Sequence, residues 1–193
     1  HPGPPAVATR SRGRARARSG VQSVSIGVLG GGAWGTALAQ MLASDGRDVL
    51  LWALEPEVVE AVNHQHRNPL YLPSATLVPG IRATGELGEM AGLDTLLVVT
   101  PAQHTGRVLG AMASHPRDLV LCAKGIDAAT GQLLNDLTRA VAPKSEIAVL
   151  SGPTFAHEVA AGLPTAVTLA CGGGEAQWDR LAPQIARPAF RPY

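Results

Sequence analysis

The chain has 193 residues, which fits one large domain or one domain with a tail. With 46% hydrophobic and only 4% aromatic residues, it can bury a full core built mainly of Val, Leu, Ala and Ile. Five of the 16 basic residues lie within residues 1–20, which hold no acidic residue, so the remainder carries eleven basic against 15 acidic side chains. A mildly acidic folded part argues against a nucleic-acid-binding groove.

The two cysteines, Cys122 and Cys171, lie far apart and fit no metal-binding spacing. Cys122 falls inside an apolar run and is expected to be a small buried side chain. So few cysteines are typical of a reducing compartment. The sequence shows neither an apolar run of about 18 residues nor a secretory signal. It therefore predicts a cytoplasmic protein without a membrane span.

Residues 1–23 are rich in Pro, Ala, Arg and Ser and show neither helical nor strand periodicity. This composition predicts a disordered, Arg-rich leader. An organelle transit peptide and a nucleic-acid-binding arm are alternatives that these residues do not separate. Residues 24–193 are expected to form the folded domain.

The first predicted strand, Val24–Leu29, leads into a glycine cluster and then into a long run of helix formers. Gly30, Gly32 and Gly35 have the spacing G-x-G-x-x-G. Gly30 allows a tight turn, Gly32 lets a pyrophosphate approach the backbone, and Gly35 lets the helix lie close to the strand. The helix N-terminus offers unpaired N–H groups and a partial positive charge to the phosphates. This pattern predicts a dinucleotide site, and a glycine-rich loop without a ligand is the alternative.

The second strand is expected over Asp48–Trp52. In dinucleotide-binding folds a carboxylate near the end of this strand holds the ribose hydroxyls of NAD, and a nearby Arg suits the extra phosphate of NADP. Leu54 occupies the region of this discriminating side chain. Glu55 is followed by Pro56, a residue favoured at the first helical position. Glu55 is therefore either a ribose contact or a charge at a helix start, and the choice of cofactor stays open.

The rest of the chain alternates between predicted helices and strands. Helices are expected over 57–66, 103–114, 131–141 and 175–185, and strands over 81–84, 94–100, 118–123, 146–150 and 165–170. Continuous apolar strands are typical of a parallel sheet covered on both faces. The alternation predicts an α/β fold with a doubly wound, mainly parallel sheet. Ligands bind such sheets at the carboxyl ends of the strands, so the exits after Leu29, Ala123 and Leu150 should meet at one crevice.

Polar residues follow two of these strands. Lys124 could pair with a phosphate or polarise a carbonyl group. The segment Ser151-Gly152-Pro153-Thr154 could hold an anion through backbone N–H groups and hydroxyls, or Thr154 could simply cap the next helix. His64 and His66 are two residues apart and would not share one face of a helix, so no metal site is predicted.

Four segments make the sequence similar to bacterial-type NAD(P)-dependent glycerol-3-phosphate dehydrogenases. They are GGGAWGTALA (30–39), the stretch Asn63–Pro73, AKGID (123–127) with Thr130-Gly131, and LSGPTFAHEVAAGLPTAV (150–167). They follow the family's order, and the last is long and highly specific. The resemblance implies a Rossmann-like nucleotide-binding half. It also implies reversible hydride transfer between dihydroxyacetone phosphate and sn-glycerol 3-phosphate, a reaction that feeds phospholipid synthesis.

The resemblance also implies roles for individual residues. The cofactor, NAD or NADP, would be contacted by Gly30, Gly32, Ala33, Trp34, Gly35, Lys124 and Ala156. Glycerol 3-phosphate would be contacted by Lys124, Gly152 and Thr154. Leu54 stands where family members often carry a basic or polar residue near the adenosine ribose, which argues against a preference for NADP.

Family members continue past a segment like Ala189–Tyr193 into a helical substrate domain that carries the catalytic lysine. The resemblance therefore implies that no catalytic residue lies in this chain, and that the chain is a fragment that binds cofactor with little turnover. The dipeptides Arg187-Pro188 and Arg191-Pro192 are unusual for the family and suggest an altered terminus. A homodimer of the full-length protein is a further expectation.

Two other functions are alternatives that the glycine motif alone does not exclude. One is another reductase with this kind of nucleotide half, such as a hydroxyacid or ketopantoate-type enzyme, against which the segment Ser151–Glu158 argues. The other is a non-enzymatic nucleotide-binding module.

Overall fold

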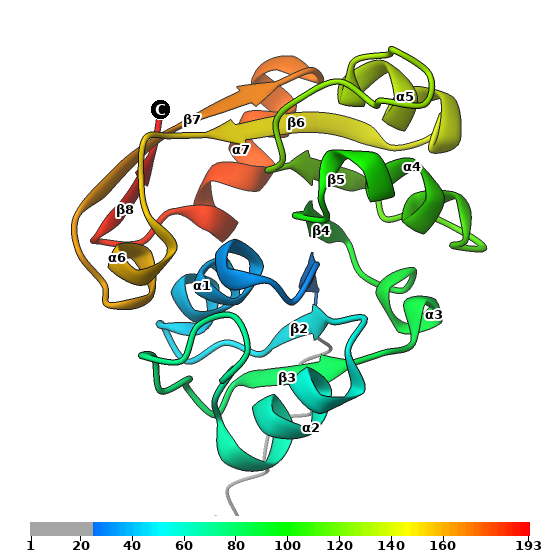
Figure 1. The fold of residues 1–193 in the computed structure, drawn as a ribbon. Coiled ribbons are helices and arrows are strands. Elements are labelled where there is room, and N and C mark those ends of the chain that lie inside the picture. Colours follow the sequence, from blue (N-terminus) through cyan, green and yellow to red (C-terminus); the bar gives the residue numbers. More distant parts are fainter. Residues whose placement is uncertain (1–24) are drawn as a thin grey trace, which may run out of the picture.

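The computed structural model describes residues 25–193, and the expected leader over residues 1–23 lies outside this range (Figure 1). Eight strands form one sheet in the order β3-β2-β1-β4-β5-β6-β7-β8. The strands are β1 (Ile26–Leu29), β2 (Val49–Trp52), β3 (Ile81–Thr84), β4 (Thr95–Val98), β5 (Asp118–Leu121), β6 (Glu146–Ser151), β7 (Thr165–Cys171) and β8 (Phe190–Pro192). The helices are α1 (Ala33–Ala43), α2 (Pro56–Gln65), α3 (Leu87–Met90), α4 (Ala102–Gly110), α5 (Leu134–Val141), α6 (Ala156–Ala160) and α7 (Gly174–Ile185).

The first six strands run parallel to one another, and every residue of β1, β2, β4 and β5 is buried. Strand β7 pairs antiparallel with β6, and β8 pairs parallel with β7. The predicted α/β class with a doubly wound, mainly parallel sheet is thus confirmed. Because β1 lies between β2 and β4, the chain reverses its direction of travel across the sheet at the carboxyl end of β1, where such sheets bind ligands.

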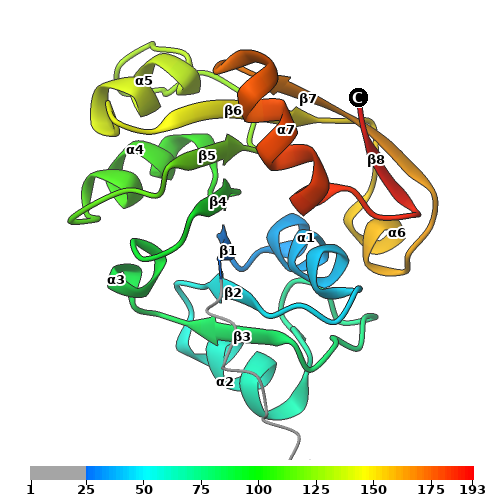
Figure 2. The same ribbon diagram turned by 180° about the vertical axis from the view of Figure 1, so that it is seen from behind.

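Helices cover both faces of the sheet (Figures 1 and 2). Val28 points to the face where it joins residues of α1, α2 and α7, whereas its neighbour Leu29 joins residues of α3, α4 and α5 on the other face. This alternation follows from the two-residue repeat of a strand. Both faces therefore bury aliphatic side chains, as the apolar runs of the sequence predict.

Two predicted helices have different bounds in the structure. The helix expected over 131–141 begins only at Leu134, because the preceding residues form a turn. In that turn the carboxylate of Asp127 accepts hydrogen bonds from the backbone N–H (2.8 Å) and the hydroxyl (2.7 Å) of Thr130. The helix expected over 103–114 ends earlier, at Gly110, with Ala111 as its C-cap residue.

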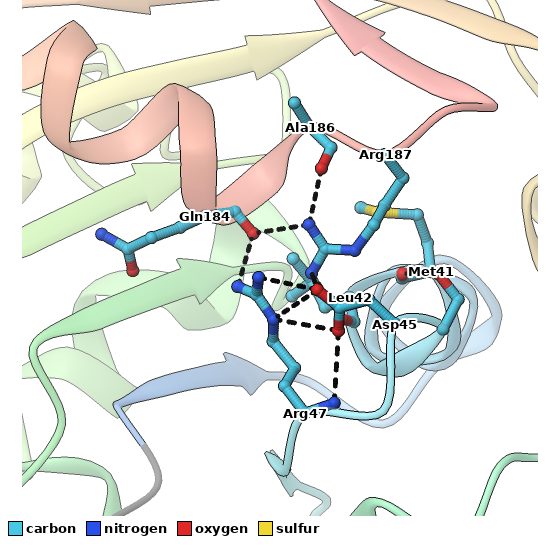
Figure 3. A network of polar contacts seen from close by, with 8 residues as sticks. Met41, Leu42, Asp45, Arg47, Gln184, Ala186 and Arg187 are labelled. Atoms are coloured by element: carbon cyan, nitrogen blue, oxygen red, sulfur yellow. Dashed lines mark hydrogen bonds and ion pairs between the residues drawn. The ribbon is translucent and has the colours of Figure 1, made fainter.

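A buried arginine ties the end of the chain to α1 (Figure 3). Arg187 is 8% exposed and donates hydrogen bonds to the carbonyl oxygens of Leu42 (2.5 Å), Gln184 (3.1 Å) and Ala186 (2.6 Å). Asp45 lies 3.4 Å from the guanidinium, and burial lowers the pKa of Arg187. Arg187 is thus an integral part of the packing between the end of α7 and α1.

Candidate functional site

The three motif glycines occupy three different environments at the carboxyl end of β1. Gly30 has a φ of +130°, a region that L side chains rarely adopt. A Cβ on Gly35 would overlap the carbonyl oxygen of Gly30, whereas a Cβ on Gly32 would meet nothing within 4 Å. The turn, the open approach and the close helix packing expected of G-x-G-x-x-G are therefore all present.

Helix α1 begins directly at this open position. Gly32 is its N-cap residue and makes no side-chain cap, and the first turn contains no acidic side chain. The first N–H groups of an α-helix have no intrahelical partner. Together with the helix dipole, they make this corner suitable for a phosphate group.

One cavity of about 290 Å³ extends from the glycine turn toward the end of β2. Leu54, Glu55 and Tyr71 line it on the β2 side, and Val99, Thr100, Pro101, His104 and Arg107 line it at the end of β4 and the start of α4. Leu54 is 69% exposed, although it is aliphatic. A concave, mainly apolar surface next to the N-terminus of α1 has the character of a nucleotide pocket.

A second cavity of about 300 Å³ lies at the ends of β5 and β6. Its lining consists of Trp34, Cys122, Lys124, Leu150, Ser151, Gly152, Thr154 and Val167. Trp34 comes from the first turn of α1, so this cavity adjoins the same helix N-terminus. The three strand exits thus meet at one edge of the sheet, but their residues are divided between two cavities instead of forming the single expected crevice.

The residues singled out after β5 and β6 lie together in this second cavity. Lys124 is exposed and lies two residues after Cys122, which is buried; burial raises the pKa of the Cys122 thiol. Close packing also favours glycine at position 152, since a Cβ there would lie 2.8 Å from Cγ1 of Val167. The N-cap residue of α6 is Phe155, so the interpretation of Thr154 as a helix cap is wrong. Ala156 starts α6, packs partly buried against the core, and does not line either cavity.

Sequence reasoning missed a polar chain that supports the first cavity. Asn68 is fully buried and donates to the carbonyl oxygen of Gly31 (2.9 Å) and to the hydroxyl of Thr36 (2.8 Å). Its own side-chain oxygen accepts from the backbone N–H of Tyr71 (3.2 Å). The hydroxyl of Tyr71 donates to Glu55 (2.6 Å), which raises the pKa of Tyr71. The one hint in the sequence was that Asn68 lies within the segment Asn63–Pro73, one of the four segments on which the family resemblance rests.

Among residues 25–193, no group of three or more His, Cys, Asp or Glu side chains lies together as a metal site would require. Within the same range, none of the helices combines the length and the apolar character needed to cross a bilayer.

Comparison with known proteins agrees with this geometry. Residues 25–177 match the family described as NAD-dependent glycerol-3-phosphate dehydrogenase N-terminus. The chain is 67% identical over 171 residues to the glycerol-3-phosphate dehydrogenase [NAD(P)+] of Erythrobacter litoralis, a match that covers 89% of the chain and 52% of that protein. It is 64% identical over 168 residues to the enzyme of the same name from Novosphingobium aromaticivorans, covering 87% of the chain and 51% of that protein.

A solved structure supports the same assignment. The glycerol-3-phosphate dehydrogenase of Coxiella burnetii superposes with a TM-score of 0.79 at 31% identity, over 88% of the chain and 53% of that structure. The chain spans about half the length of the curated relatives it matches. By sequence and by fold, the chain belongs to the family of NAD-dependent glycerol-3-phosphate dehydrogenases and corresponds to their N-terminal part.

Proposed function

We propose that this chain is the dinucleotide-binding half of an NAD(P)-dependent glycerol-3-phosphate dehydrogenase. The observation that carries the proposal is the open space beside Gly32, at the N-terminus of a helix and between two cavities. A diphosphate needs a backbone that it can approach closely, and a side chain at this position would occupy the approach.

The residues present fit a dinucleotide. The backbone of Gly30, Gly32 and Gly35 would hold the diphosphate, with the N–H groups of Ala33 and Trp34 directed by the helix start. The cavity lined by Leu54 and Glu55 would take the adenosine end. When bound, the nicotinamide supplies the hydride chemistry, while the protein supplies orientation and electrostatics.

The second cavity would receive the substrate, dihydroxyacetone phosphate or glycerol 3-phosphate. Lys124 would place a positive charge beside the substrate and the cofactor, where it can pair with a phosphate or polarise a carbonyl oxygen. Gly152 and Thr154 would contribute backbone N–H groups and a hydroxyl to the substrate phosphate. Trp34 and the buried Cys122 would form the apolar wall that limits the access of water. Ala156, at the start of α6 and packed against the core, would contact the cofactor, as the resemblance implies.

The chain spans about half of its matched relatives, so we propose cofactor binding without appreciable turnover for the 193 residues alone. A missing general acid or base alone typically costs a factor of about 10²–10⁴ in rate. Steady oxidation of NADH or NADPH with dihydroxyacetone phosphate by the purified chain would contradict this part of the proposal.

Calorimetric titration with NADH and NADPH tests the binding itself. We expect at least one of them to bind the wild-type chain, and Gly32→Ala to weaken that binding at least tenfold, because the new Cβ enters the space reserved for phosphate. Since φ of Gly32 is −73°, alanine is tolerated by the backbone, and the circular dichroism spectrum should not change. If neither dinucleotide binds to a folded sample, the proposed function is wrong.

A further inference from the structure

The end of β2 presents a carboxylate to the first cavity at the place where the adenosine ribose would lie. A Cβ on Gly31 would come within 2.5 Å of the Cβ of Ala53, so the segment after β2 lies against the glycine turn. Two residues further on, Glu55 lines the same cavity as Gly30 and Gly32. Glu55 is the N-cap residue of α2, but its side chain makes no cap hydrogen bond and is directed to Tyr71 instead.

Tyr71 fixes the orientation of this carboxylate. Its hydroxyl donates to Oε1 of Glu55 at 2.6 Å, which leaves Oε2 as an acceptor for another donor. Tyr71 is itself held through Asn68, which is fully buried and bonded to the carbonyl oxygen of Gly31. Hydrogen bonds through Asn68 and Tyr71 therefore fix the position of the Glu55 carboxylate relative to the glycine turn.

The charges around this position favour a ribose with free hydroxyls. A carboxylate accepts hydrogen bonds from a 2′-hydroxyl but repels a 2′-phosphate. Leu54, which precedes Glu55 between β2 and α2 and also lines the cavity, provides no positive charge. The cationic side chain of the lining is Arg107, which belongs to α4 and stands with Pro101 and His104 at the end of β4. Because β2 and β4 flank β1 on opposite sides, Arg107 lies on the other wall of the cavity.

We propose that Glu55, oriented by Tyr71, selects NAD(H) over NADP(H). This inference rests on the proposed function, because it assumes that the first cavity holds the adenosine end of a dinucleotide. It names Glu55 as a specificity-determining residue and Tyr71 as its positioning residue.

The test compares the dissociation constants of NADH and NADPH, measured by calorimetry on the full 193-residue chain. We expect the wild type to bind NADH at least tenfold more tightly than NADPH. Glu55→Gln should shrink this ratio about tenfold, mainly by tightening NADPH. Tyr71→Phe should shift the ratio in the same direction by a smaller factor, because the carboxylate remains but is no longer held.

Glu57→Gln is the matched control, since Glu57 lies in the first turn of the same helix and does not line the cavity. It should leave the ratio of the two dissociation constants unchanged. Equal or tighter binding of NADPH by the wild type would overturn the inference, and so would an unchanged ratio in Glu55→Gln. If Arg107→Gln weakens NADPH selectively in a wild type that prefers it, the 2′-phosphate lies on the α4 wall instead. Failure of both dinucleotides to bind would refute the proposed function, which is a different result.

Discussion

Arg187 donates a hydrogen bond of 2.5 Å to the carbonyl oxygen of Leu42, a residue 145 positions earlier in the sequence. The carbonyl of Leu42 belongs to the last turn of α1, where carbonyl groups lack intrahelical partners. The same guanidinium reaches Gln184 and Ala186 at the end of α7 (Figure 3). One buried cation thus caps two helices that pack on the same face of the sheet.

Arg187→Ala should therefore lower the free energy of unfolding by about 2–3 kcal/mol, because it leaves buried carbonyl groups without donors. Urea denaturation followed by circular dichroism measures this change. Arg191→Ala is the control, since Arg191 is exposed and should change stability by less than about 0.5 kcal/mol. Equal midpoints for both variants would show that the contacts of Arg187 contribute nothing net.

Gly35→Ala should damage the fold, in contrast to Gly32→Ala. A Cβ at position 35 would overlap the carbonyl oxygen of Gly30, which is backbone and cannot rotate away. We expect a loss of about 2–3 kcal/mol in stability, in the range of overpacked cores, together with loss of dinucleotide binding. Thermal unfolding and calorimetry on both variants separate the two effects. A Gly35→Ala protein as stable as the wild type would mean that α1 can move away from the turn freely.

Asp118 is a buried carboxylate at the start of β5, and it anchors α7 to the sheet. It accepts hydrogen bonds from Nε2 of Gln177 (3.0 Å) and from Nε (3.1 Å) and Nη2 (2.9 Å) of Arg180. Removing one partner of a buried ion pair costs more than the pair contributes, because the other charge loses its compensation. Asp118→Asn should cost about 3 kcal/mol, the lower end of the usual range, because Arg180 also contacts Glu146. A urea midpoint within error of the wild type would contradict this expectation.

Glu89 should contribute a pH-dependent increment to stability. Arg82 donates to it at 2.6 Å and the hydroxyl of Thr84 at 2.7 Å, and these contacts lower the pKa of Glu89. Because the pKa in the folded state lies below that of the unfolded chain, the increment is complete above the ordinary value of about 4.3. It is lost as the pH falls through the folded-state pKa.

Glu89→Gln should accordingly flatten the decline of stability between about pH 5 and pH 3, and cost less than about 1 kcal/mol at pH 7, since the pair is exposed. Urea denaturation at a series of pH values measures the slope, and Glu86→Gln, on the neighbouring exposed position, is the control. Identical slopes for wild type and Glu89→Gln would exclude a lowered pKa at this residue.

The alternation of apolar runs was enough to predict the class of fold and most of its strands. The direction of β7 was not predicted, although its pattern contained a hint. Val167 and Leu169 are buried while Ala166 and Thr168 are exposed, the one-sided alternation typical of antiparallel strands. Strand β8 was not predicted because it contains Pro192, and proline disfavours a strand. Proline is tolerated at the edge of a sheet, which is where β8 lies.

The candidate site was predictable where local spacing determines geometry, as it does for the glycines before α1. Its supporting contacts were not, because they join residues far apart in the sequence. The residues next to Asn68 in the sequence do not indicate that its amide bonds to Gly31 and Thr36. In the same way, the sequence around Glu55 does not indicate that Tyr71 is its partner. The division into two cavities depends on how side chains from separate segments lie in three dimensions, which no periodicity encodes.

The hydrogen bond from the amide of Asn68 also affects the rigidity of the glycine turn. By satisfying the carbonyl of Gly31 from within the protein, it holds the turn in a single shape whether or not an anion is present. A ligand that arrives at a rigid receptor loses little free energy to ordering of the receptor. Amide hydrogen exchange across α1 should therefore be slow in the free protein and change little on addition of dinucleotide, and association should be limited by encounter, not by rearrangement.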